Sequence, residues 1–106
     1  MKTYKITIGD PWDFKGPDGQ NLIRGIILKR EDKFIIFKSN NKIMFEEGKG
    51  DIFVLSLRHI NTDFSNLKNG VSVNGGLILS DHIDNLSAEE IKRNSKFVFI
   101  GSIREE

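Results

Sequence analysis

Residues that are able to do chemistry are few in this chain, and they are poorly grouped. There are two histidines and no cysteine, which excludes disulfides, thiolate metal sites and cysteine nucleophiles. His82 follows Ser80 and Asp81 directly, whereas the members of a hydrolytic triad are spread along a chain because the fold must set their angles. Neither a zinc-ligand spacing nor a phosphate-binding glycine motif occurs. The sequence therefore favours a binding protein over an enzyme, and we expect no catalytic residue, no metal ion and no cofactor.

The strongest candidate for binding is the segment 9–21, which reads GDPWDFKGPDGQN and carries the single Trp of the chain. Long connections without regular structure are often functional, and an aromatic side chain held between carboxylates is typical of a protein-binding hot spot. The candidate partner-binding residues are Asp10, Trp12, Asp13, Phe14 and Asp18. We expect them to bind another protein, of basic character, as an immunity protein or an enzyme inhibitor does. The alternative is that Trp12 plugs one end of the core.

A nucleic-acid-binding surface is the second hypothesis. Such surfaces combine basic residues with aromatic ones, and both kinds gather around two predicted hairpin turns, although several Glu and Asp residues lie among them. The basic candidates are Arg24, Lys29, Arg30, Lys33, Lys38 and Lys42. A third hypothesis is a small-ligand barrel, which would hold an apolar pocket with a few polar groups.

Part of this region resembles a known family. Gly9-Asp10, Trp12 and Phe14 precede a loop rich in Gly and Pro, then Arg24 and an apolar strand at 26–28. This order is similar to the opening of ribosome-independent endoribonuclease toxins, which have an SH3-like barrel. The resemblance implies nucleic-acid binding, with Arg24 as the phosphate-contacting group. The chain departs from the family where Gly25 follows Arg24 in place of Pro, and no later Ser or Thr site matches.

Length and composition limit the kinds of secondary structure that can position these residues. The 106 residues are the length of one domain, and we expect a single domain over 1–106. Lys and Arg number 16 against 15 Asp and Glu, which disfavours a strongly polybasic protein. Fifteen Ile and eight Phe accompany a single Ala, and such a composition favours strands over helices. The predicted fold is mainly β (β-rich α+β), a small antiparallel barrel or sandwich of about seven strands with one short helix.

Turn signals divide the chain into short strands. The predicted strands span 3–8, 22–30, 33–38, 42–46, 52–60, 71–73, 77–80 and 97–103. Residues 39–41, 48–51, 69–70 and 74–75 are predicted to be turns, the last two because Asn-Gly favours a type I′ turn. Ser87 and Glu90 form a capping box, which predicts the helix near 87–93.

Several predicted strands are apolar on both faces, Ile35 and Ile36 among them. Burial of both faces in the core explains this pattern best. An exposed apolar face or edge that joins two copies into a homo-oligomer is the alternative. The apolar residues after Lys5 are too few for a signal peptide, and no window approaches the length of a membrane helix. We therefore expect a cytoplasmic protein that does not bind membranes.

Overall fold

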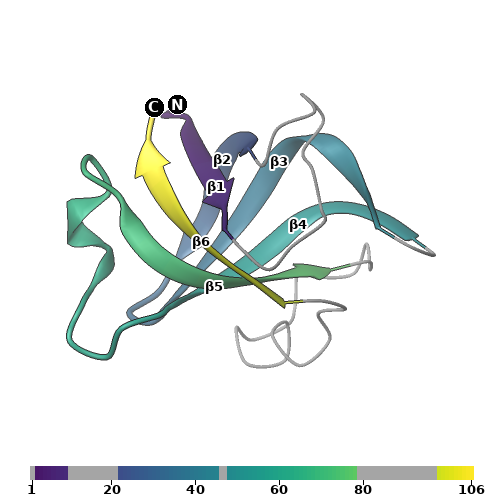
Figure 1. Ribbon diagram of the computed structural model, residues 1–106. Helices are drawn as coiled ribbons and strands as arrows, with labels where there is room; N and C mark the ends of the chain where they lie inside the picture. Colours follow the sequence, from purple (N-terminus) through teal and green to yellow (C-terminus); the bar gives the residue numbers. More distant parts are fainter. Residues whose placement is uncertain (1, 10–21, 46–47, 79–97) are drawn as a thin grey trace.

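The computed structural model describes residues 2–9, 22–45, 48–78 and 98–106. Their regular elements are β1 (Tyr4–Ile8), β2 (Leu22–Arg30), β3 (Phe34–Phe45), β4 (Gly48–Leu57), the short 3-10 helix η1 (Phe64–Asn66), β5 (Val71–Ile78) and β6 (Val98–Glu105). Each strand pairs antiparallel with the next, and β6 pairs back with β1, so that the sheet closes into a barrel (Figure 1). The predicted small antiparallel β fold is confirmed, as a barrel and not a sandwich. The helix predicted near 87–93 lies outside the described residues.

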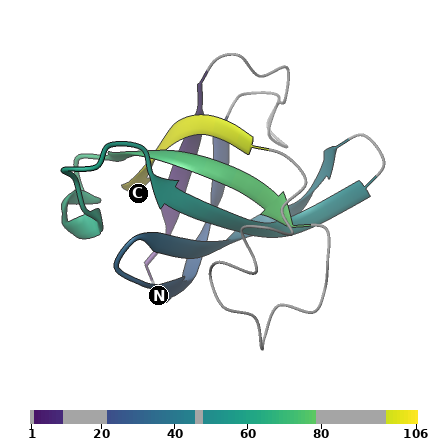
Figure 2. The same ribbon diagram turned by 90° about the horizontal axis from the view of Figure 1, so that it is seen from below.

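Alternation of apolar and polar residues sets the two faces of each strand. In β1, Ile6 and Ile8 are buried and Thr7 between them is exposed. Because side chains point to opposite faces at every second residue, the buried set of each strand lines the interior. Figure 2 shows the strands curving around that interior, with η1 at one end. Because the barrel closes between β6 and β1, residues near the two ends of the sequence are neighbours. The backbone N–H of Glu106 donates to the carbonyl of Thr3 at 3.0 Å.

The interior is filled by three phenylalanines and the branched side chains around them. Phe53 packs edge to face against Phe37 at a centroid distance of 6.3 Å and against Phe99 at 5.9 Å. All three rings are fully buried, as are Ile6 and Ile23. Aromatic pairs prefer this geometry, which adds to the gain from burying their area. The surplus of Phe and Ile in the composition is thus largely a packing requirement of the barrel.

A second, smaller apolar cluster lies on the outward side of β3 and β4. Ile36, Ile52 and Val54 are buried there, with Phe34 packed against them. Ile35, the neighbour of Ile36, belongs to the interior cluster. Both faces of this part of the sheet are therefore buried, which is the reason for its continuous apolar sequence. Association into a homo-oligomer stays a prediction.

Three predicted turns are wrong, because each lies within a strand. Residues 39–41 continue β3, where the register with β4 shifts between Lys38 and Ile43. Ser39 is buried, and its Oγ accepts from the N–H of Asn41 at 3.2 Å, so polar residues form an irregularity and not a hairpin. Residues 48–51 begin β4. Sequence signals for a turn and for a bulge are similar, since both use Gly, Ser and Asn.

The third of these, Asn74-Gly75, lies in the middle of β5. A Cβ on Gly75 would overlap the ring of Phe99. Gly75 is therefore present because the aromatic core approaches the backbone closely, a role that glycine also plays within strands. At the other Asn-Gly pair Gly70 does have a positive φ, of 99°. Its N–H donates to the carbonyl of Asn66 at 3.1 Å, which closes the turn after η1.

Candidate functional site

Three cationic side chains form one row across the outside of β6, β1 and β2. Lys5 lies directly opposite Arg104 on one side and directly opposite Arg24 on the other. Their neighbours Ile6, Ile103 and Ile23 are buried in the interior, so strand alternation turns all three cations outward. Directly opposed residues have Cβ atoms about 4.5–5.5 Å apart. The closed barrel thus places three positive charges side by side from three separate parts of the chain.

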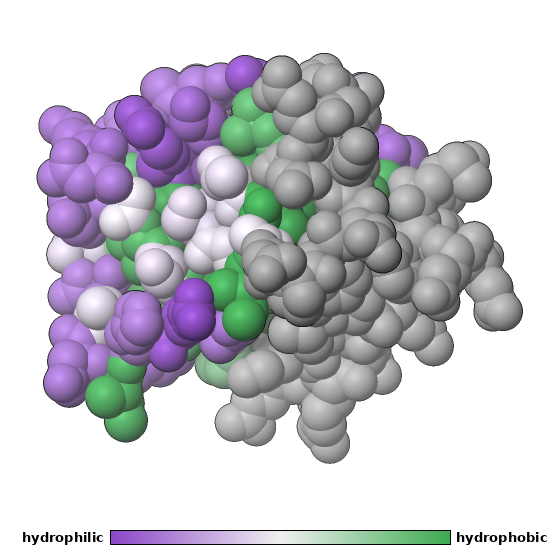
Figure 3. Space-filling model, viewed as in Figure 1, coloured by the Kyte–Doolittle hydropathy of each residue, from purple (hydrophilic) through white to green (hydrophobic). Residues whose placement is uncertain are grey.

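The adjoining row of the same outer face carries small hydroxyl side chains. Thr7 lies opposite Ser102, and Ser102 lies opposite Ser72. The row ends at Arg58, whose backbone N–H donates to the carbonyl of Ser72 at 3.1 Å. In Figure 3 the area over β5 and β6 is pale, which marks small polar residues and glycines, and purple hydrophilic side chains border it. We call these two rows the basic face: Lys5, Arg24, Arg58 and Arg104 with Thr7, Ser72 and Ser102.

Among the described residues, the carboxylate paired with the basic face is that of Glu106. Nε of Arg24 donates to Oε1 of Glu106 at 2.5 Å, and both side chains are partly exposed. Within the part of the chain that the structure describes, Lys5, Arg58 and Arg104 make no ion pair. Like charges directly opposite each other destabilise a sheet. Among the described residues, the repulsion between Lys5 and Arg104 therefore has a cost in stability that no ion pair offsets, whereas Glu106 compensates Arg24.

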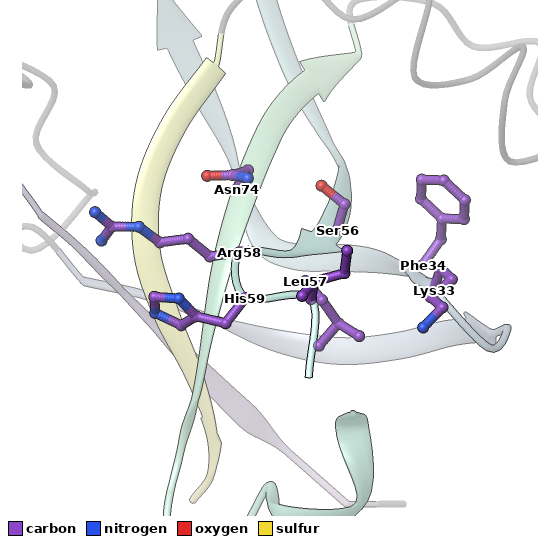
Figure 4. A pocket seen from close by; sticks show the side chains of 8 residues that line it. Lys33, Phe34, Ser56, Leu57, Arg58, His59 and Asn74 are labelled. Carbon is purple, nitrogen blue, oxygen red and sulfur yellow. The ribbon is translucent and has the colours of Figure 1, made fainter. Parts of the chain in front are cut away.

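A pocket of about 310 Å³ adjoins the basic face, and we call it the end pocket. It is lined by Lys33 and Phe34 where β3 begins, by residues 56–60 where β4 ends, and by Asn74 on β5. Figure 4 shows Arg58 and His59 extending to one side, while Phe34 stands on the other. Arg58 belongs to both the pocket and the basic face, so the two form one continuous surface.

Another hollow of about 330 Å³ lies around η1, between that helix and the ends of β1 and β6. Its walls are held by internal contacts: the guanidinium of Arg30 donates to the carbonyl of Phe64, and Lys2 pairs with Glu105 at 3.3 Å. Because these charged groups are engaged with the protein, this hollow is a weaker candidate than the end pocket.

Asp63 caps the first turn of η1. The hydroxyl of Ser65 donates to its Oδ1, and the backbone N–H of Ser65 donates to the same atom at 2.9 Å. These two hydrogen bonds hold the pKa of the Asp63 carboxyl below its usual value of 3.8, and Arg30 and Lys33 lower the pKa further. The carboxylate is therefore an acceptor that orders the connection between β4 and β5.

The sequence-predicted basic residues do not form one patch. Arg24 belongs to the basic face, and Lys33 lines the end pocket. Lys29 pairs with Glu31 at 2.9 Å, and Lys42 pairs with Asp51 at 3.7 Å. Arg30 is bonded to the Phe64 carbonyl, and Lys38 is exposed opposite Ile26. The predicted partner-binding residues Asp10, Trp12, Asp13, Phe14 and Asp18 lie outside the described residues, so the protein-binding hypothesis stays a prediction.

Sequence reasoning missed Lys5, Arg58 and Arg104. Lys5 and Thr7 alternate with Ile6 and Ile8 in the sequence, and this alternation indicates that Lys5 and Thr7 point outward. The sequence does not indicate the register that sets Lys5 beside Arg104, because that register depends on closure of the sheet between the first and last strands. His59, to which the sequence assigns no role, lines the end pocket and is exposed.

In comparisons with known proteins, no family model, no curated protein and no solved structure matches the chain. Among the described residues no group of three or more His, Cys, Asp or Glu side chains is placed to hold a metal ion. Nor does any helix in the described part have the length and apolar character to cross a membrane. Function is therefore inferred from the geometry of the chain itself.

Proposed function

We propose that this barrel binds nucleic acid by its phosphate backbone on the basic face. The observation that carries the proposal is the position of Lys5 between Arg24 and Arg104 on adjacent strands. Neighbouring strands lie about 4.8 Å apart, so that the three cations span about 10 Å. Along the axis of a stacked helix one strand has a phosphate about every 3.4 Å, so this length corresponds to about three successive phosphates.

Hydroxyl groups beside the cations suit the same ligand. Half or more of protein contacts to nucleic acid go to phosphate and sugar, and Ser and Thr side chains make many of them. Thr7, Ser72 and Ser102 adjoin the cationic row and are small enough for a backbone to approach. No acidic side chain points outward from the described residues of the two rows. Among the described residues, a polyanion would therefore meet donors and the unpaired charges of Lys5 and Arg104, and it would compete with Glu106 for Arg24.

The energetic argument points the same way. Placing three like charges side by side destabilises the folded chain, and function is a common reason for residues that reduce stability. Bound phosphates would remove the repulsion. The overall charge of only +1 means that attraction is local to this face and not a property of the whole molecule.

The test compares wild type with Lys5→Gln by fluorescence anisotropy of a labelled single-stranded oligonucleotide at low ionic strength. We expect wild type to bind, and Lys5→Gln to bind about fivefold more weakly, which corresponds to about 1 kcal/mol. Lys29→Gln is the matched control, since it removes the same charge five residues along β2 from Arg24, about 16 Å away. It should bind as wild type does.

Two results would contradict the proposal. One is the absence of any affinity for RNA or DNA at low salt. The other is an equal loss of affinity in Lys5→Gln and Lys29→Gln, which would indicate general attraction and not a site. Binding of wild type to anionic vesicles or to an acidic peptide in preference to the oligonucleotide would likewise assign the basic face to a different ligand.

A further inference from the structure

We infer that the end pocket receives one unstacked nucleobase of the bound strand, so that the ligand is single-stranded nucleic acid. This inference rests on the proposed function, because the phosphates on the basic face bring the strand to the pocket. It adds the class of nucleic acid and a second group of contacts, made to a base and not to phosphate.

The position of the pocket is the first argument. Ser56 and Asn74, which both line the pocket, lie directly opposite each other on β4 and β5. Their row is the next one along from the row of Ser72 and Arg58, two residues or about 7 Å away. Arg58 lies at the boundary and contributes to both. A strand whose phosphates contact Arg58 and the cationic row therefore places its adjacent sugar and base over the pocket.

The chemistry of the walls is the second argument. Phe34 stands on one side and His59 on the other (Figure 4), which offers two flat π systems across one hollow. Unpaired bases are recognised in proteins by stacking on aromatic and histidine side chains. Ile60 at the pocket edge is 90% exposed, so that a base seated there would cover apolar surface that water now contacts.

Ser56 and Asn74 supply hydrogen-bonding groups that match the edge of a base. Asn74 carries both a donor and an acceptor, and Ser56 carries a hydroxyl that serves as either. Both residues are half-buried, and their side chains make no hydrogen bond with the described part of the chain. Lys33 on one side and Arg58 on the other add positive charge on two sides of the hollow. This combination fits a base flanked by phosphates better than it fits an uncharged apolar ligand.

The experiment measures the affinity of three oligonucleotides of equal length: a single strand, the same single strand with abasic sites throughout, and a duplex. We expect the normal single strand to bind at least about fivefold more tightly than the abasic strand, the lower end of what one stacked base contributes. Phe34→Leu keeps an apolar side chain against Ile36 and Val54 but removes the ring. It should weaken the normal strand to the level of the abasic one and leave the abasic affinity unchanged.

The Lys5→Gln variant separates the two proposals, because it should weaken both single strands by the same factor. If Lys5→Gln weakens binding while Phe34→Leu does not, the base pocket is wrong and the phosphate site stands. If no oligonucleotide binds to wild type, both are wrong. A duplex that binds as tightly as the single strand would overturn the inference about the pocket alone.

A spectroscopic test covers the case in which Phe34→Leu does not fold. In wild type, a nucleoside monophosphate should shift the side-chain amide signals of Asn74 in a ¹⁵N-correlated NMR spectrum. Ribose 5-phosphate, which has the phosphate and no base, should leave those signals in place. Equal shifts with both compounds, or no shift with either, would contradict a base in this pocket.

Discussion

Lys5 on β1 lies directly opposite Arg104 on β6, at the seam where the first and last strands of the barrel meet. On its other side Lys5 faces Arg24 of β2, whose guanidinium is bonded to Glu106. The closing seam of the barrel is thus also a place where cationic side chains of three neighbouring strands adjoin one another. Stability and ligand binding make opposite demands on this one position.

Replacement of Lys5 by Glu should stabilise the protein. A carboxylate between Arg24 and Arg104 would turn two repulsive cross-strand neighbours into attractive ones. Each such pair contributes roughly 0.2–1 kcal/mol, so we expect the free energy of unfolding in urea to rise by about 1 kcal/mol at low salt. The gain should shrink at high salt because Arg24 and Arg104 are exposed to solvent and Lys5 is partly exposed. Lys5→Glu should also lose its binding of nucleic acid. A lower stability of Lys5→Glu than of wild type would contradict the inference that the three cations repel one another.

The salt dependence of binding reports how many phosphates are contacted. For a single strand, the slope of log K against log salt is about −0.7 per neutralised phosphate. Three or four cations on the basic face therefore predict a slope of about −2 to −3. Lys5→Gln should reduce its magnitude by about 0.7, whereas Lys29→Gln should leave it unchanged. An unchanged slope in Lys5→Gln would mean that Lys5 does not contact phosphate.

Gly75→Ala should destabilise the barrel, because the added methyl group would overlap the fully buried ring of Phe99. Overpacking of this kind costs about 1–3 kcal/mol, seen as a lower urea midpoint. The loss should be smaller in a Phe99→Leu background, where the ring is absent. An equal loss in both backgrounds would show that Gly75 is required for its backbone conformation and not for the space it leaves.

Acid should remove the stabilising effect of Asp63. Its pKa is lowered from 3.8 in the folded protein, so its carboxylate favours folding above pH 3.8 and loses this effect as the pH falls through the lower folded value. Asp63→Asn should therefore be less stable than wild type at pH 7, and the difference should narrow below pH 3.8. Urea unfolding of both proteins between neutral and acid pH measures this. A difference that persists unchanged at low pH would mean that the charge of Asp63 is not involved.

Prediction from sequence succeeded where a local pattern carries the information. The alternation of apolar and polar residues defined β1, and the residues of β2 were predicted to both ends. Prediction was wrong at residues 39–41, at 48–51 and at Asn74-Gly75, where the same residue types that make turns instead make an irregular strand or leave space for a ring. The difference depends on what packs against the backbone from elsewhere in the chain.

The candidate site divides in the same way. Composition and periodicity alone determined that the chain forms a small antiparallel β fold with a core of Ile and Phe, and alternation was enough to turn Lys5 outward. Only the tertiary structure decided that Lys5 lies between Arg104 and Arg24, and that Phe34 and His59 share one pocket. The physical reason is that side-chain alternation is a property of a single strand, whereas register and closure depend on how all six described strands pack around one interior.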